Sequence, residues 1–550
     1  MNKHILFAGV LAVFMAVMFA GCGGSGSFGP TTAGTKKPIT FTFHNEDASE
    51  DMPFSDPVAL RIKELTGVTL EVRRPVGGDQ QSIPLMLASG DYPDLIFAKG
   101  NIGMLIEAGA VIPLDDFIEK RGQNLKTLYG DQIGRLRNST SDPRIYTVGT
   151  WGVNNAIWTT DGTMQLQHAV LKELGYPKMQ TLQDYEQAIK TYMARHPTIN
   201  GRRTIGFSLL IDTWQWYISL SNPSCFLLGY ADDGQWVVDR DTLEAKYKFM
   251  VPDARLYYQW LNRMNAEGLL DPETFTQKED EWRAKIASGR VLGTSYPLWG
   301  YGEARTSLVN EGRPERTFAY LPITADERFK SAALQDYGFA GGWGISISSQ
   351  CRDPERAFEF LDWLCSEEAQ ILVNWGIEGV NYQVVDGKRV VPQDEQRRAD
   401  TDPDYSRKTG VGRWVHPFPQ KGNMFVDSTG NYITRDSPER IKESYHDIER
   451  ETLAAYGAAM WIDLFPSSES LGKSRHGQAW QYALSPDLNA KIVEADNYMK
   501  NALANIVLGR PENFNASWQR IQQELTRMGM EDANRAMTKM IRDKVELWNR

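Results

Sequence analysis

Residues Gly338 to Tyr382 read GFAGGWGISISSQCRDPERAFEFLDWLCSEEAQILVNWGIEGVNY, and the predicted fold depends on this stretch. In its GISIS segment, apolar and polar residues alternate as in a half-buried strand. Asp353 then occupies an N-cap position before Pro354, and apolar residues follow at helical spacing, which predicts a helix of about three turns. Ser366 is the predicted cap of a second helix, and Gly376 is its predicted stop. An aromatic turn follows.

This series resembles extracellular solute-binding proteins of family 1, in particular the large lipoprotein branch of bacterial ABC importers for sugars and oligosaccharides. In that branch a GGWGI strand, a DPE helix, an SEEAQ helix and a GIEGVNY turn mark a late crossing between two lobes. The resemblance implies an α/β, two-lobed periplasmic-binding-protein-like fold, with a hinge of about three crossings and a ligand cleft between the lobes. It also implies that the protein binds its ligand without acting on it. Further similar segments are ASGDYPDLIF (88–97), AGAVIPLDDFI (108–118), EGLLDPE (267–273) and KIASGRV (285–291).

Length and composition fit this expectation. The chain has 550 residues, more than one ordinary core holds, and its composition is that of a folded, water-soluble protein. Its formal net charge of -10 argues against nucleic acid and against a broadly polyanion-binding surface.

The N-terminus carries an apolar run of about 15 residues behind Lys3 and His4, which suits a signal peptide better than a membrane span. The segment Phe19-Ala20-Gly21-Cys22 looks like a lipobox, although Phe19 stands where leucine is commonest. We expect a signal peptide over residues 1–21, Cys22 carrying acyl chains such as palmitate, and a flexible tether over 22–37. The protein would then be lipid-anchored at the extracytoplasmic face of the bacterial cell membrane. The alternative is an ordinary signal peptide cut elsewhere.

Alternating strand and helix patterns from Ile39 to Phe97 predict a parallel, right-handed α/β lobe. We expect residues 38–150 and 300–375 to form lobe 1, and 151–299 and 376–550 to form lobe 2. The chain would therefore cross between lobes near residues 150, 300 and 375. Several crossings make a hinge that bends while each lobe stays rigid.

Ligands of such sheets lie at the carboxyl ends of the strands, and rings stack well on the apolar faces of sugars. For any single residue, the competing roles are a place in the core for tryptophan and ordinary solvation for a polar loop side chain. The aromatic segment from Gln478 to Tyr482 has no assigned role. The predicted ligand-binding residues are Asn45, Glu46, Asn101, Trp151, Trp214, Trp216, Trp299, Tyr301, Trp343 and Glu378.

The sequence predicts neither a metal site nor a cofactor. Relatives often carry an acidic calcium loop where this chain has HPTINGRRT (196–204), which lacks carboxylates, so we expect no calcium there. Cys225, Cys351 and Cys365 show no zinc spacing. The predicted helix separates the last two by roughly 20 Å, beyond disulfide reach.

Motifs of hydrolases, metalloproteases and nucleotide-binding loops are missing from the sequence. The function that the resemblance implies is a monomeric substrate-binding lipoprotein of an ABC importer, with an oligosaccharide and the permease subunits as partners. A membrane-anchored carbohydrate-active enzyme is one alternative, because two catalytic carboxylates can lie far apart in a chain. A peptide-binding receptor of similar length is the other.

Overall fold

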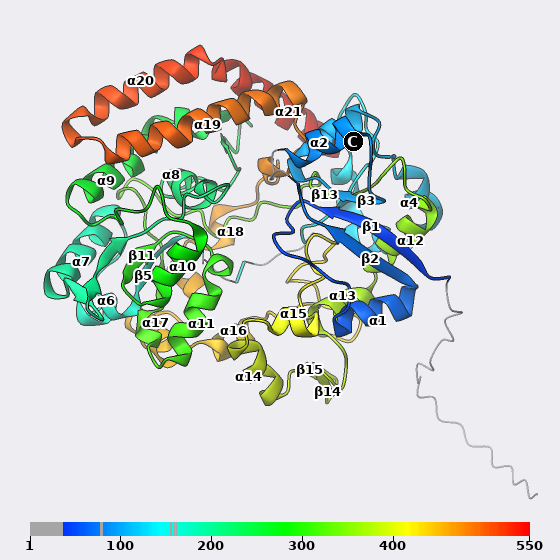
Figure 1. Ribbon diagram of the computed structural model, residues 1–550, viewed down its shortest axis with the longest axis horizontal. Coiled ribbons are helices and arrows are strands. Elements are labelled where there is room, and N and C mark those ends of the chain that lie inside the picture. Colours follow the sequence, from blue (N-terminus) through cyan, green and yellow to red (C-terminus); the bar gives the residue numbers. More distant parts are fainter. Residues whose placement is uncertain (1–36, 77–80, 154–156, 159, 161, 550) are drawn as a thin grey trace, which may run out of the picture. The chain divides into compact units, whose positions relative to one another are not determined.

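The structure is a computed structural model that describes residues 37–76, 81–153, 157–158, 160 and 162–549 (Figure 1). The chain divides into two units, Met1–Lys37 and Pro38–Arg550, and the described helices and strands lie in the second. The predicted signal peptide, Cys22 and all but the last residue of the tether lie outside the described residues. Among the helices of the described part, none is both long and apolar enough to span a bilayer.

The first sheet has five strands in the order β2-β1-β3-β13-β4. Strand β1 is parallel to β2 and β3, whereas β13 is antiparallel to β3 and β4. Strands β1, β3 and β4 therefore end at the same edge, where β13 begins. The bounds are β1 (Ile39–Asn45), β2 (Val68–Arg73), β3 (Leu95–Phe97), β4 (Val148–Gly149) and β13 (Gly344–Ile347).

The two helices predicted from the opening stretch are α12 (Pro354–Leu364) and α13 (Glu367–Trp375). The Asp353 carboxylate accepts the backbone N–H of Arg356 at 3.1 Å, and the Ser366 hydroxyl accepts that of Ala369 at 3.2 Å, so both predicted caps are confirmed. Other helices around the first sheet are α1 (Pro57–Thr66), α2 (Ser82–Ser89), α3 (Ile102–Glu107), α4 (Asp115–Arg121), α5 (Gln123–Tyr129) and α15 (Tyr405–Thr409).

The second sheet has four strands in the order β12-β5-β11-β8. Strand β11 is parallel to β8 and antiparallel to β5, which in turn is antiparallel to β12. The bounds are β5 (Met164–Gln167), β8 (Ile205–Phe207), β11 (Val291–Thr294) and β12 (Phe318–Leu321).

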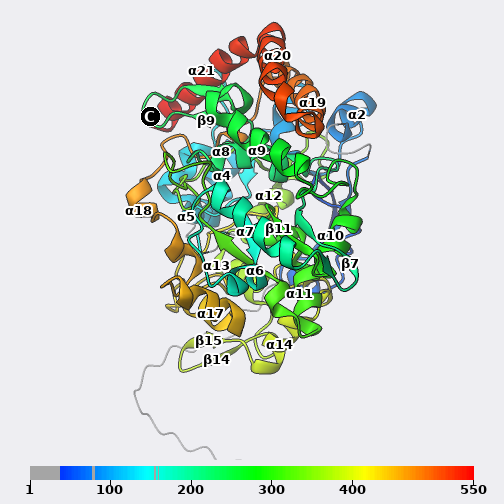
Figure 2. The same cartoon turned by 90° about the vertical axis from the view of Figure 1, so that its left-hand side faces the viewer.

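Helices α19, α20 and α21 pack together in one group, which both ribbon views show (Figures 1 and 2). The helices that contribute to the core of the second sheet or lie beside it are α6 (His168–Glu173), α7 (Leu182–Arg195), α8 (Pro223–Phe226), α9 (Arg255–Ala266), α10 (Glu279–Ala287), α11 (Gly302–Asn310), α17 (Asp447–Ala455), α19 (Pro486–Leu508), α20 (Phe514–Arg527) and α21 (Met530–Trp548).

The remaining helices and strands are short and lie outside both sheets. They are β6 (Thr198–Ile199), β7 (Arg202–Arg203), β9 (Trp236–Val238), β10 (Ala245–Tyr247), β14 (Gln383–Val385), β15 (Lys388–Val390), α14 (Gln393–Thr401), α16 (Pro438–Ser444) and α18 (Ser468–Leu471).

Each sheet has its own large hydrophobic core. One core joins β1, β3 and β13 to α1 and α12, and the other joins β5, β8, β11 and β12 to α7, α9 and the three C-terminal helices. Because two separate cores are built on two separate sheets, the chain has a two-lobed α/β fold, as the sequence predicts.

The chain changes sheets at places that differ in part from the prediction. One change lies between β4 and β5. Strand β12 pairs with β5, so the next change lies within residues 322–343 and not near residue 300. The aromatic turn near residue 300 instead connects β11 to α11 within the second lobe. Buried hydrophobic residues between 405 and 418 belong to the first core, which differs from their place in the predicted lobe 2. Most buried hydrophobic residues from Tyr445 to Ile541 belong to the second core.

Candidate ligand-binding site

The shared strand edge of the first sheet collects several of the predicted site residues. Asn45 ends β1, Asn101 lies shortly after β3, Trp151 follows β4 and Trp343 precedes β13. Register confirms the arrangement, because Ile345 of β13 pairs with Phe97 at the end of β3. In open α/β sheets this edge is where ligands bind.

Three tryptophans meet at this edge and form what we call the indole cluster, Trp151, Trp343 and Trp480. The Trp480 ring contacts both of the others, with its centroid 4.7 Å from that of Trp343 and 5.4 Å from that of Trp151. Both contacts are edge to face, at 74° and 83°. Trp480 is not among the ligand-binding residues predicted from the sequence. It lies in the aromatic segment 478–482, and nothing local in that segment indicates which sheet it reaches.

A charged group borders the indole cluster. Lys99 forms an ion pair with Asp47, and its Nζ lies 5.7 Å from the Trp343 ring centroid. His416 Nε2 lies 2.8 Å from Asp47 Oδ2, and its ring packs 5.5 Å from that of Trp151. Burial opposes ionisation of Asp47, but the hydrogen bond with His416 and the charge of Lys99 outweigh it, so the pKa of this carboxyl lies below its ordinary value. Lys99 also has a φ of 50°, a backbone conformation that is rare outside glycine.

The second sheet presents a different aromatic arrangement, the tryptophan pair Trp214 and Trp299. Trp214 follows β8 and Trp299 follows β11, so both come after the carboxyl ends of parallel strands. Their ring planes are 24° apart and their centroids are separated by 5.9 Å. Trp299 is 60% exposed and Trp214 is 38% exposed. Large rings left this open provide faces on which a ligand can stack.

Several other predicted site residues are enclosed by protein. Trp216 packs against Tyr217 and Phe249, and the Tyr301 hydroxyl donates to Gln165 Oε1 at 2.6 Å. These buried positions favour supporting roles over ligand contact.

The predicted polar residues are distributed among different roles. Asn45 is buried and uses its side-chain oxygen to accept the backbone N–H of Asp47 at 3.0 Å, which shapes the loop after β1. Asn101 accepts a hydrogen bond from Asn489 of α19 at 3.3 Å. Glu378 is exposed in the turn between α13 and β14, where its backbone pairs with Tyr382. Asn45 and Asn101 therefore lie at the strand edge that carries the indole cluster, but their side chains are engaged in hydrogen bonds within the protein.

Glu46 belongs to a buried trio with His44 and Ser82. Ser82 Oγ donates to the Glu46 carboxylate at 2.5 and 2.6 Å, and His44 Nε2 contacts the same carboxylate at 2.6 Å. A serine nucleophile needs its hydroxyl hydrogen-bonded to the histidine base. Here the carboxylate separates the two, so this trio has the connectivity of a structural network.

The loop that replaces the calcium loop of relatives is a short hairpin of β6 and β7. Asn200 and Gly201 form its turn with positive φ values of 51° and 74°. In the part of the chain that the structure describes, no group of three or more His, Cys, Asp or Glu side chains is placed to hold a metal ion.

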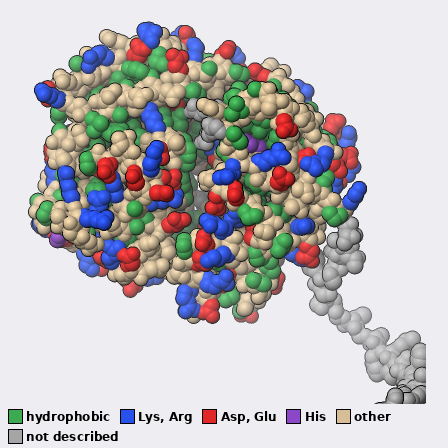
Figure 3. Space-filling view, viewed as in Figure 1, with side chains coloured by type: hydrophobic (Ala, Val, Ile, Leu, Met, Phe, Trp, Pro, Cys, Tyr) green, Lys and Arg blue, Asp and Glu red, His purple; other side chains and the backbone are tan. Residues whose placement is uncertain are grey.

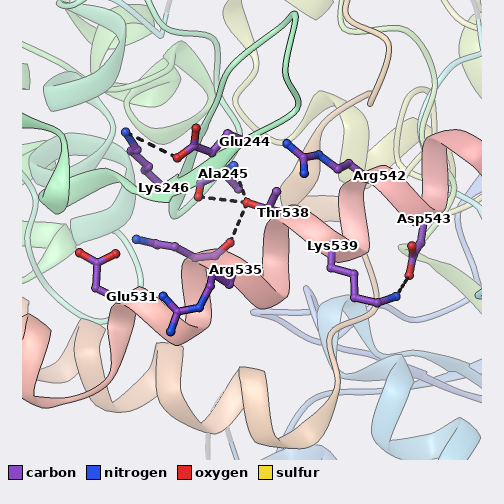
Figure 4. A pocket seen from close by; sticks show the side chains of 10 residues that line it. Glu244, Ala245, Lys246, Glu531, Arg535, Thr538, Lys539, Arg542 and Asp543 are labelled. Atoms are coloured by element: carbon purple, nitrogen blue, oxygen red, sulfur yellow. Dashed lines mark hydrogen bonds and ion pairs between the residues drawn. The ribbon is translucent and has the colours of Figure 1, made fainter.

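A pocket of about 540 Å³ lies between β10 and α21 (Figure 4). Two ion pairs lie within its lining, Lys539 with Asp543 and Lys246 with Glu244 at 3.7 Å. Thr538 accepts the backbone N–H of Ala245 at 2.9 Å. None of its ten lining residues, all within the described ranges, is aromatic. This pocket therefore offers no stacking surface.

The chain is similar in sequence to bacterial proteins that include a lipoprotein and an ABC transporter substrate-binding protein. The chain is 22% identical over 385 residues to lipoprotein LipO of Bacillus subtilis, covering 68% of this chain and 72% of LipO. It is 22% identical over 371 residues to FusA of Streptococcus pneumoniae, a fructooligosaccharide ABC transporter substrate-binding protein, covering 63% of this chain and 64% of FusA.

Solved structures show the same fold. FusA in complex with kestose superposes with a TM-score of 0.67 at 16% identity, covering 92% of this chain and 99% of that one. The alginate-binding protein AlgQ2 without calcium superposes with a TM-score of 0.66 at 16% identity, covering 92% and 98%. Residues 59–395 match the family described as bacterial extracellular solute-binding protein. Because this match covers more than half of the chain, the protein belongs to that family.

Proposed function

We propose that the protein captures an oligosaccharide between its two lobes and delivers it to the permease subunits of an ABC importer. The observation that carries this proposal is the exposed Trp214 and Trp299 pair at the strand edge of the second sheet. The C–H faces of pyranose and furanose rings are apolar and stack on such rings. The resemblance to FusA, whose structure contains kestose, supports the same ligand class.

Closure on the ligand would give the permease a way to recognise the loaded receptor. A ligand favours closure only when it binds the closed form better than the open one, so contacts from both lobes are needed. The second lobe supplies the tryptophan pair. The indole cluster combines Trp151 and Trp343, beside strands of the first sheet, with Trp480, whose neighbours Ala479 and Tyr482 lie in the second core. An oligosaccharide that contacts both groups would therefore contact both lobes.

The proposal includes a monomeric receptor that is tethered to the membrane through acylated Cys22. The supporting observations are the lipobox-like sequence and the similarity to lipoprotein LipO. On the face shown in Figure 3, basic and acidic side chains are interspersed over the surface. Labelling cells with a palmitate analogue tests the anchor, since Cys22→Ser is expected to remove the label from the protein.

Thermal-shift screening against plant and bacterial oligosaccharides tests the function. A receptor shows a raised thermal midpoint while chromatography recovers the sugar unchanged. Consumption of the sugar would favour the carbohydrate-active enzyme instead. A shift with peptides but not with sugars would favour a peptide receptor.

Trp299→Ala is expected to weaken binding of the best oligosaccharide by roughly 1 kcal/mol or more, about fivefold or more in Kd, because one stacking face is lost. Its side chain is largely exposed, so the thermal midpoint without ligand should change little. Isothermal titration calorimetry measures the change in Kd. The matched control is Trp363→Ala on α12, whose indole N–H donates to Glu368 at 3.2 Å, outside both aromatic groups. Equal binding by Trp299→Ala and wild type would show that this pair is not a platform.

A further inference from the structure

The position of Trp480 differs from that of an ordinary site wall. It is the common neighbour of Trp151 and Trp343 and contacts each of them through ring edges. The Trp480 ring therefore occupies space beside both tryptophans in which a sugar ring could otherwise contact them.

The backbone that carries Trp480 is firmly held. Asp233 accepts the backbone N–H of Ala479 at 2.9 Å and contacts His476 Nε2 at 3.1 Å, and all three residues are buried. On one side a Cβ added at Gly234 would lie 2.5 Å from the Trp480 Cβ. On the other side a Cβ added at Gly342 would lie 1.6 Å from the Gln481 carbonyl oxygen. Because the main chain is fixed between two glycines, the indole can leave its position only by rotation of its own side chain.

The indole N–H groups give a second observation, although Trp158, Trp260, Trp282, Trp461 and Trp548 share it. Within the described residues, the Nε1 atoms of Trp151, Trp343 and Trp480 are all buried without a hydrogen-bond partner. Buried donors are normally paired, and an unpaired donor destabilises the packing that encloses it. Three orphans in one cluster mean that the present packing of these rings is not held by their polar groups. The arrangement therefore favours replacement of the ring contacts by a ligand that offers hydrogen-bond acceptors to these N–H groups.

We propose that the Trp480 indole is a plug that occupies a sugar subsite between Trp151 and Trp343 and swings out when the ligand enters. The inference rests on the proposed function and deepens it. The incoming group is a ring with apolar C–H faces and several acceptor oxygens, because its faces replace the Trp480 contacts and its hydroxyl oxygens accept the orphan N–H groups. An aromatic ring without acceptors would replace the contacts but leave the donors unpaired. Trp480 therefore selects for polyhydroxylated ligands.

A plug competes with the ligand, so its removal should strengthen binding. The apparent Kd is the intrinsic Kd divided by the fraction of protein in which the subsite is open. Trp480→Ala is expected to bind the best oligosaccharide of the thermal-shift screen about five- to tenfold more tightly than wild type. Trp480→Phe retains a ring and should stay near the wild-type Kd. Trp343→Phe keeps the plug but removes one donor, so it should bind more weakly.

The experiment is calorimetric titration of wild type and the three variants with that oligosaccharide, with Trp548→Ala as a control. Trp548 packs on Tyr482 at 5.9 Å in the same region but outside the indole cluster. Tighter binding by Trp480→Ala alone supports the plug. Equal or weaker binding by Trp480→Ala overturns the plug and leaves the proposed function standing.

A second measurement separates the two proposals if no sugar binds any variant, which would overturn the proposed function. Free indole is added to wild type and to Trp480→Ala, and the thermal midpoints are compared. A midpoint raised only in Trp480→Ala supports a subsite that the Trp480 ring normally fills. An unchanged midpoint overturns the plug as well.

Discussion

Replacing Lys285 with methionine is expected to lower the free energy of unfolding by about 3–5 kcal/mol, because the change leaves a buried carboxylate without its cation. The Lys285 side chain is 7% exposed, and its Nζ lies 2.8 Å from Asp271 Oδ2 and 3.1 Å from Oδ1. It also donates to Gln277 Oε1 at 2.7 Å. Methionine fills similar space but supplies neither charge nor donors.

The partner carboxylate explains the size of this effect. Asp271 is 1% exposed in its side chain and accepts the Ser208 hydroxyl at 2.7 Å, just beyond the end of β8. Its backbone N–H donates to Phe207 at 2.8 Å, so it cannot move to solvent without disturbing the second sheet. The pair thus joins the EGLLDPE segment to the KIASGRV segment.

Urea denaturation followed by circular dichroism measures the loss. The double variant Lys285→Met with Asp271→Leu should regain part of it, because no unpaired buried charge remains. The control is Lys278→Met, since that lysine is 70% exposed and pairs with Asp212 at the surface. Its unfolding curve should overlay that of wild type. A loss of less than about 1 kcal/mol in Lys285→Met would contradict a structural role for the buried pair.

Individual helices and strands could be predicted from the sequence because the residues that determine them are close together in the chain. The predicted Asp353 and Ser366 caps are both present. Each motif satisfies backbone groups within one helical turn, so no distant residue is needed to form it. The parallel β1, β2 and β3 arrangement followed in the same way from alternating strand and helix patterns.

The burial of individual site residues could not be predicted. Trp299 is 60% exposed, whereas Tyr301, two residues later, is 2% exposed. Similarly, Trp214 is exposed and Trp216 is buried. The exposure of side chains two residues apart differs here because residues distant in the chain cover one and not the other. A single sequence does not show that packing. Trp480 was missed for the same reason, since it meets Trp151 across more than 300 residues of chain.

The prediction of a change of sheet near residue 300 failed for a related reason. An aromatic turn containing Trp299 is compatible with a crossing and with a strand-to-helix connection. Only the pairing of β12 with β5 distinguishes them, and this pairing joins segments about 150 residues apart. The trio of His44, Glu46 and Ser82 shows the same limit, because the Ser82 contact determines whether Glu46 faces a ligand or the interior.

The second large expected effect is a loss of folding stability at acidic pH. His168 is fully buried, its Nδ1 lies 2.8 Å from Thr452 Oγ1, and its Nε2 has no hydrogen-bond partner among the described residues. Burial lowers the pKa of His168 from 6.5 to about 4, with Glu449 opposing this shift and Arg305 adding to it. The native core therefore holds a neutral imidazole at every pH above about 4.

The sign of the pH dependence follows from which state binds the proton. Between pH 6.5 and 4 the unfolded chain protonates this histidine and the folded chain does not, so stability falls as the pH falls. The contribution is fully present above pH 6.5 and is lost as the pH reaches about 4, with a total of about 3 kcal/mol. About 2 kcal/mol of it should be lost by pH 5. His446, whose pKa is also lowered by burial, acts in the same direction.

His168→Gln isolates the effect, because glutamine retains a partner for Thr452 but does not titrate. Urea denaturation at pH 7.5 and 5.0 should show a fall in unfolding free energy that is about 2 kcal/mol smaller in this variant than in wild type. The control is Thr452→Val, which removes the hydrogen bond but keeps the buried imidazole. It should be less stable at both pH values and retain at least the wild-type difference between them. If His168→Gln loses as much stability between pH 7.5 and 5.0 as wild type does, the acid sensitivity resides in other groups, and the buried imidazole is not its source.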